Sequence, residues 1–193
     1  MTATATERNT TDFPIAPMLT ERWSPRGFDA THTIERDELL SVVEAARWAP
    51  SAGNTQPWAF VAARRGTPAF DAILGTLAGF NQAWVPNASA LIVFASVPER
   101  AGRMQAFTAY DLGQAAAHAT LQVEHLGLNA HQMGGFDRDA VAAALNLPEG
   151  VQPMTLMAIG RHDDSDAVDA SIRERDAAPR ARLGLDEVLV LAQ

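Results

Sequence analysis

A nearly unbroken apolar run, Ala88 to Val97, constrains the fold of this chain more than any other feature. Such a run is typical of a strand that lies in the middle of a sheet and is covered on both faces. It has about half of the length that a membrane-spanning helix requires. The chain has 193 residues, which suits one domain with a single core. We therefore expect a sheet built around this strand.

Helical and strand patterns are intermixed along the rest of the chain. Apolar spacing predicts helices over residues 16–22, 35–48, 67–79, 106–126 and 137–145. It predicts further strands over residues 58–63, 128–132 and 154–160. This order lacks the regular alternation of a parallel doubly wound sheet, so we expect an α+β layered domain. It would span residues 16–193, after a flexible N-terminal tail at residues 1–15.

Charge and composition exclude several classes of function. The net charge of −8 disfavours a broad nucleic-acid interface, and the absence of cysteine excludes thiolate nucleophiles and Cys-ligated metals. The histidines at 118, 125, 131 and 162 form no recognised metal spacing, so we expect no metal site. The Thr-rich start has neither a basic region nor an apolar run, and we expect a cytoplasmic protein without a membrane segment.

A polar loop, residues 49–58, lies between a predicted helix and a predicted strand. Pro50 and Gly53 end the helix, and Ser51, Asn54 and Gln56 place hydrogen-bonding side chains close together. Polar loops between rigid elements are common places for binding a ligand rich in heteroatoms. We therefore treat the loop as a candidate binding element.

Two arginine-bearing segments stand out in this acidic chain: Arg22 with Ser24 and Arg26, and Arg180 with Arg182. In an extended segment, residues two apart point to one side, so the first three side chains could form a cradle for phosphate or carboxylate. Either segment alone would more simply be a set of solvated arginines paired with acidic residues. The polar loop and the glycine pair below favour the cradle.

The glycine pair, Gly134 and Gly135, follows a predicted strand. It would let main-chain N–H groups approach a planar ligand, although a plain turn explains it equally well. No G-x-G-x-x-G follows a strand, and no P-loop is present. Ser51 lacks the context of a nucleophile elbow, which leaves little support for hydrolase chemistry.

Four separated segments together resemble the nitroreductase family of FMN-dependent oxidoreductases, from about residue 18 to the C-terminus. They are residues 22–28 (RWSPRGF), 49–58 (APSAGNTQPW), 133–136 (MGGF) and 179–182 (PRAR) ahead of 185–188 (LDEV). The resemblance implies a central, mostly antiparallel sheet flanked by helices. It also implies an intertwined homodimer with two FMN molecules at the subunit interface.

The resemblance also implies roles for particular residues. Arg26 would face N1 and O2 of the flavin, where it would stabilise the negative charge of the reduced ring. Asn81 would contact the pyrimidine edge, and Gly134 and Gly135 would offer N–H groups near N5 and O4. The phosphate and ribityl chain would be held by Arg22, Ser24, Arg180 and Arg182. The partner subunit would contribute Pro50, Ser51 and Asn54. The same motifs make candidates of Trp23, Ala52, Gln56 and Met133.

These roles lead to a hypothesis for the activity. We expect an NAD(P)H oxidoreductase that reduces small electron-poor acceptors, such as nitroaromatics or quinones, by ping-pong hydride transfer. Two alternatives stay open: a flavin store or regulatory module without nicotinamide turnover, and a flavoenzyme that oxidises or dehalogenates a dedicated metabolite. The short connection at residues 97–106 leaves open whether a lid covers the flavin.

Overall fold

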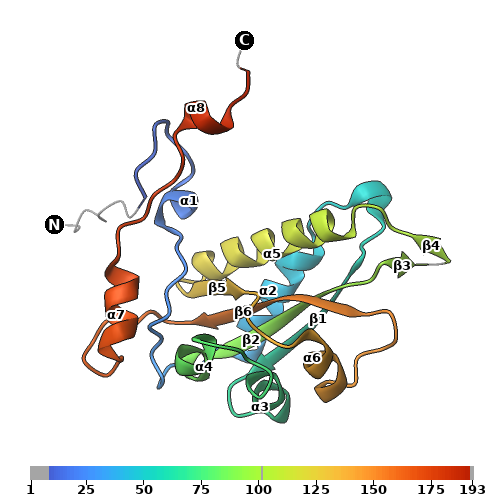
Figure 1. The fold of residues 1–193 in the computed structure, drawn as a ribbon, viewed down its shortest axis with the longest axis horizontal. Coiled ribbons are helices and arrows are strands. Elements are labelled where there is room, and N and C mark those ends of the chain that lie inside the picture. Colours follow the sequence, from blue (N-terminus) through green and yellow to red (C-terminus); the bar gives the residue numbers. More distant parts are fainter. Residues whose placement is uncertain (1–8, 101, 192–193) are drawn as a thin grey trace.

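The computed structural model describes residues 9–100 and 102–191 (Figure 1). Four strands form one sheet in the order β1-β2-β6-β5, and every neighbouring pair is antiparallel. The strands are β1 (Trp58–Arg64), β2 (Ala90–Ser96), β5 (Asn129–Met133) and β6 (Gln152–Gly160). The expected α+β class and the expected antiparallel sheet are both confirmed.

Helices cover both faces of this sheet (Figure 1). Helices α2 (Arg36–Arg47) and α5 (Thr108–His125) pack on one face and on each other. The opposite face carries α3 (Pro68–Leu74), α4 (Asn81–Trp84) and α6 (Arg138–Ala144). The remaining helices are α1 (Pro17–Glu21), α7 (Ala170–Ala177), α8 (Leu185–Val188) and the 3₁₀ turns η1 (Ala52–Asn54) and η2 (Val85–Asn87).

Strand β2 explains this layering. All seven of its residues are buried, and successive side chains point to opposite faces of the sheet. Ile92 and Phe94 belong to the core shared with α2 and α5, whereas Leu91 and Val93 belong to the core on the other face. Small side chains on α5, including Ala115 and Ala119, are fully buried in the core that α5 shares with α2 and the sheet. These small side chains leave room for α2 to pack closely against α5.

The helix predicted over residues 67–79 ends early, and the cause is tertiary. Thr67 accepts a hydrogen bond from the Phe70 N–H and caps α3, which ends at Leu74. Beyond it, Ala78 donates its N–H to the Gly135 carbonyl at 2.9 Å, and Asp137 donates to the Thr76 carbonyl at 2.9 Å. These bonds draw residues 76–78 into strand-like pairing beside the glycine pair.

Two further elements lie where the sequence indicated only loops. Within residues 162–176, an acidic and polar stretch of the sequence, Asp169 caps α7 by accepting the Ser171 N–H, and Ile172 is buried. The short connection at residues 97–106 contains a small hairpin of β3 (Glu99–Arg100) and β4 (Arg103–Met104). One buried residue in a polar helix gives almost no periodic signal, which is why the composition concealed α7.

The two terminal segments, residues 9–22 and 178–191, lie side by side and extend away from the sheet (Figure 1). Arg180 joins them by donating to the Asn9 side chain at 2.6 Å. Both segments expose large apolar side chains, among them Phe13, Leu183, Val188 and Val190. Residues 1–8 of the expected tail lie outside the described residues. Among residues 9–100 and 102–191, no helix combines the length and the apolar character that crossing a bilayer requires.

Candidate functional site

Three arginines converge on one cavity that is lined by residues of both terminal segments. Arg22, Arg180 and Arg182 line a space of about 270 Å³ together with residues 9–11 and the apolar side chains of Ile15 and Leu19. Arg180 donates to the Arg22 carbonyl at 3.0 Å, so the two predicted arginine segments, far apart in sequence, are joined directly. This cavity is called the arginine cavity below.

The electrostatics of the arginine cavity favour an anion. Burial, followed by the positive charge of Arg182, lowers the pKa of Arg22 below its ordinary value, and Glu124 opposes this shift. Arg22 donates to the Ser24 hydroxyl at 3.3 Å, so a hydroxyl lies next to the guanidinium. Guanidinium groups present planar sets of donors that match phosphate and carboxylate oxygens.

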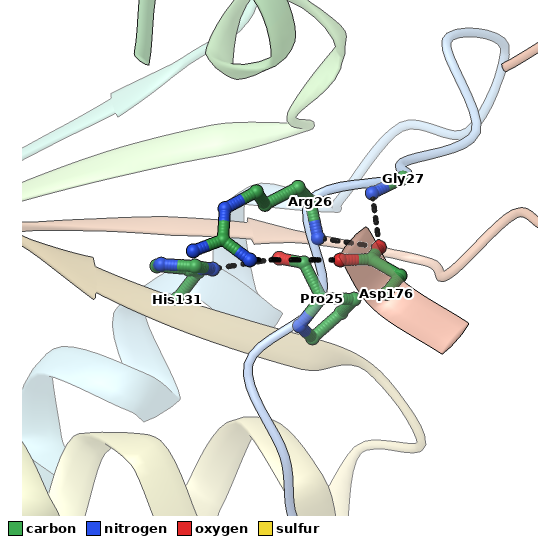
Figure 2. Close-up of polar contacts among 5 residues, drawn as sticks. All are labelled: Pro25, Arg26, Gly27, His131 and Asp176. Atoms are coloured by element: carbon green, nitrogen blue, oxygen red, sulfur yellow. Dashed lines mark hydrogen bonds and ion pairs between the residues drawn. The ribbon is translucent and has the colours of Figure 1, made fainter. Parts of the chain in front are cut away.

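Arg26 does not share this cavity, contrary to the single cradle that residue spacing suggested. The Arg26 guanidinium lies 3.8 Å from one carboxylate oxygen of Asp176. The main-chain N–H of Arg26 donates to the other oxygen of that carboxylate at 2.7 Å (Figure 2). The preceding residue, Pro25, is also fixed, because the Nδ1 of His131 lies 2.9 Å from its carbonyl oxygen. Burial lowers the pKa of His131, which favours the neutral ring that donates to this carbonyl.

The polar loop adopts an unusual backbone. Gly53, Asn54 and Gln56 all have positive φ angles, of 59°, 55° and 49°. The left-handed region is costly for Gln, and such conformations are often found at functional sites. The Ser51 hydroxyl supports the turn by accepting the Gln56 N–H at 3.0 Å.

A buried carboxylate anchors the same loop from α5. Asp111 is 1% exposed and accepts the Ala52 N–H at 3.1 Å. Sequence reasoning missed this residue, as it missed Asp176. A lone Asp on an apolar helix face was the available signal for Asp111, whereas nothing local distinguished Asp176 from the other acidic residues around it.

The structure brings together Asn81 and the glycine pair. The Asn81 amide donates to the Gly135 carbonyl at 3.1 Å. A Cβ atom at Gly135 would lie 2.7 Å from the Asn81 amide nitrogen, so only glycine fits there without displacing Asn81. Within residues 9–100 and 102–191, neither the N–H of Gly134 nor that of Gly135 donates a hydrogen bond to the protein. Two main-chain donors therefore stay available at this point.

Other predicted residues lie apart from the arginine cavity. Trp23 is buried with its ring edge-on to His162, beside a different cavity, and the Met133 side chain is in the core. No residue of the polar loop lines the arginine cavity in the described part of the chain. No group of three or more His, Asp or Glu side chains among the described residues could hold a metal ion.

Comparisons with known proteins agree on one family. The model of the Nitroreductase family matches residues 19–69 and 66–161, which include the polar loop and the glycine pair. A solved "oxidoreductase containing FMN" is similar with a TM-score of 0.89 and 32% identity over 98% of both chains.

Two sequence relatives add to these matches. The "Uncharacterized 15.4 kDa protein in ask 5'region" of Mycolicibacterium smegmatis is 37% identical over 136 residues, covering 67% of this chain and 92% of its own. The "Putative NAD(P)H nitroreductase YdgI" of Bacillus subtilis is 28% identical over 181 residues, covering 74% of this chain and 86% of its own.

Replacing Asp111 with Ala should destabilise the protein and loosen the polar loop. The variant removes the acceptor of the Ala52 N–H, and we expect the free energy of unfolding to fall by about 1–3 kcal/mol. Urea denaturation measures this loss, and limited proteolysis at residues 50–57 reports the loop. The control is Asp139→Ala, an exposed Asp in α6. Equal unfolding free energies for the two variants would contradict the anchoring role.

Proposed function

Because this chain belongs to the nitroreductase family, we propose that it is an FMN-dependent oxidoreductase that takes electrons from NAD(P)H and passes them to small electron-poor acceptors. The observation that carries this proposal is the arginine cavity, where three guanidinium groups from both ends of the chain meet. The FMN in the similar solved oxidoreductase supports the identity of the cofactor.

The arginine cavity fits the phosphate of FMN. A phosphate carries up to two negative charges, and desolvating it requires several cationic partners. Arg22, Arg180 and Arg182 supply these charges, while the Ser24 hydroxyl next to Arg22 would contact the phosphate or the ribityl chain. Burial, followed by the positive charge of Arg182, lowers the pKa of Arg22, and a bound anion would offset both effects.

The glycine pair and Arg26 would face the isoalloxazine ring. The two N–H groups at Gly134 and Gly135, which donate to no protein atom within the described residues, would point at N5 and O4. Arg26 would lie near N1 and O2, and Asn81 at the pyrimidine edge. Bound FMN supplies two-electron hydride chemistry, and Arg26 would stabilise the charge that reduction places on the ring.

We propose further that the active molecule is a homodimer. Leu183 and Val190, 67% and 100% exposed, belong to a terminal segment that does not bury its own apolar side chains. A second copy would cover such side chains. The polar loop does not line the arginine cavity of its own chain. In the proposed dimer, Pro50, Ser51 and Asn54 would therefore contact the flavin of the partner subunit.

The proposed cycle is ping-pong. NAD(P)H would reduce the flavin and leave, and a nitroaromatic or a quinone would then occupy the same place. Among the described residues of the 97–106 connection, 97–100 and 102–106, two short strands, β3 and β4, form a hairpin and no helix is present. An open flavin face would suit several flat acceptors.

Purification and FMN reconstitution test the proposal directly. We expect a yellow protein whose colour dithionite bleaches, which runs as a dimer, and which oxidises NADH or NADPH when a nitroaromatic or a quinone is added. A protein that stays colourless after reconstitution would contradict FMN binding. A yellow protein that neither nicotinamide reduces would contradict the oxidoreductase activity and favour a flavin store or a dedicated flavoenzyme.

Replacing Arg22 with Ala should weaken FMN binding far more than riboflavin binding. Riboflavin lacks the phosphate, so loss of a phosphate contact leaves its affinity nearly unchanged. A charged hydrogen bond contributes about 1.5–3 kcal/mol, which predicts a loss of roughly 10- to 150-fold in FMN affinity. Quenching of flavin fluorescence measures both affinities. Arg36→Ala, which changes an exposed arginine on α2, is the control. Equal losses for the two flavins would place the phosphate elsewhere.

Replacing Arg26 with Ala should slow hydride transfer while FMN stays bound. The arginine cavity remains intact in this variant, whereas the charge next to the reduced ring is lost. We expect the rate of flavin reduction by NAD(P)H to fall by about 10²-fold or more. Stopped-flow absorbance of the bound flavin measures this rate. Reduction at the wild-type rate would remove Arg26 from the mechanism.

A further inference from the structure

Asp176 lies at the last turn of α7 with its side chain only 6% exposed. One of its oxygens, Oδ2, accepts two hydrogen bonds at 2.7 Å each, from the main-chain N–H groups of Arg26 and Gly27 (Figure 2). A carboxylate that accepts two N–H groups fixes the orientation of two successive peptide planes. The main chain at Arg26 is therefore held from a helix that is 150 residues away in sequence.

The second oxygen of Asp176 faces the side chain of Arg26. Oδ1 is buried, accepts no hydrogen bond among the described residues, and lies 3.8 Å from Nη1 of Arg26. At this distance the guanidinium is attracted but is not hydrogen-bonded to the carboxylate. The Arg26 side chain is 32% exposed, so its donors remain accessible to a ligand.

The surroundings leave this segment little freedom. A Cβ atom at Gly27 would collide with the main-chain oxygen of Asp163 and would lie 3.5 Å from Oδ2 of Asp176. The Gly27 carbonyl accepts the Asp163 N–H at 3.1 Å, and His131 lies against the Pro25 carbonyl. Asp176 thus completes a set of contacts that fixes residues 25–27 from both sides.

We propose that Asp176 is the positioning residue that holds Arg26 against the flavin. This inference rests on the function proposed above. Asp176 acts through the main chain of Arg26 and Gly27 and does not touch the reacting atoms. A misplaced Arg26 no longer stabilises the reduced ring, so loss of the anchor lowers the midpoint potential of bound FMN and slows its reduction.

Placement and charge have opposite effects on that potential, which separates the two roles. Removing a negative charge near the flavin raises the potential, because it removes Coulomb repulsion of the reduced, negatively charged ring. Losing the position of Arg26 lowers it, by about 30 mV for each tenfold loss in the preference for reduced flavin. The sign of the shift therefore identifies the role of Asp176.

Three substitutions of Asp176 test the proposal. Asp176→Asn keeps an acceptor oxygen and removes the charge. Asp176→Glu keeps the charge and moves the acceptor by one methylene, and Asp176→Ala removes both. We expect the Glu variant to lower the midpoint potential and to slow flavin reduction at least tenfold, while Asn stays at or above the wild-type potential. In the Ala variant the two effects oppose each other, and we expect its potential to fall below that of the Asn variant. If Ala fails to fold, the comparison of Glu with Asn is sufficient.

The same substitutions in the Arg26→Ala background complete the test. There the placement effect should vanish, so Asp176→Glu should leave the potential of Arg26→Ala unchanged. Asp166→Ala is the matched control, because Asp166 pairs with Arg173 of α7 at the surface and does not contact Arg26. Potentials that rise equally for Asn and Ala and do not change for Glu would overturn the proposal.

Hydrogen exchange separates failure of this inference from failure of the proposed function. In the protein without added FMN, the amides of Arg26 and Gly27 should exchange faster in the Ala and Glu variants than in the wild type or the Asn variant. We expect this order of exchange rates even if the chain binds no FMN. Failure to bind FMN would refute the proposed function but not the anchoring by Asp176. Wild-type protection in all variants would refute the anchoring by Asp176.

Discussion

The burial of β2 on both faces is the constraint on which the rest of the structure depends. A strand of seven buried residues requires a strand on each edge and a layer of helices on each face. Helices α2 and α5 cover one face and α3, α4 and α6 the other, so the middle of the sheet is filled by core side chains. The polar groups proposed to bind the flavin therefore lie in the loops, in the terminal segments and at the start of α4, at the margin of the layers.

Two buried carboxylates fix the loops at that margin. Asp111 on α5 holds Ala52 in the polar loop, and Asp176 on α7 holds the segment that carries Arg26. Asp111 accepts one main-chain N–H group and Asp176 accepts two, which fixes the backbone relative to each carboxylate and satisfies donors that turns leave free. Rigid placement matters for the proposed chemistry, because a charge stabilises a reduced ring only from a defined distance.

Local patterns in the sequence were sufficient for most of the fold and for part of the candidate site. The apolar run predicted β2, and helical spacing predicted α2 and α5 to within about two residues at each end. The early end of α3 could not be predicted, because it depends on the hydrogen bond from the Ala78 N–H to the Gly135 carbonyl, 57 residues away in sequence. The pairing of Asn81 with Gly135 depends on the same long-range contact, although the resemblance had indicated both residues.

The sequence by itself determined the class of fold, the residue types available for an anion and the order of the motifs, because these depend on local periodicity and composition. Only the tertiary structure decided which of those residues meet. In the folded chain Arg180 contacts Arg22, which is 158 residues away in sequence, whereas Arg26 lies apart from both. Arg26 pairs instead with Asp176, one of several acidic residues in its stretch of the sequence. The physical reason is that a buried ion pair or main-chain anchor is defined by the packing of distant elements, which no local pattern encodes.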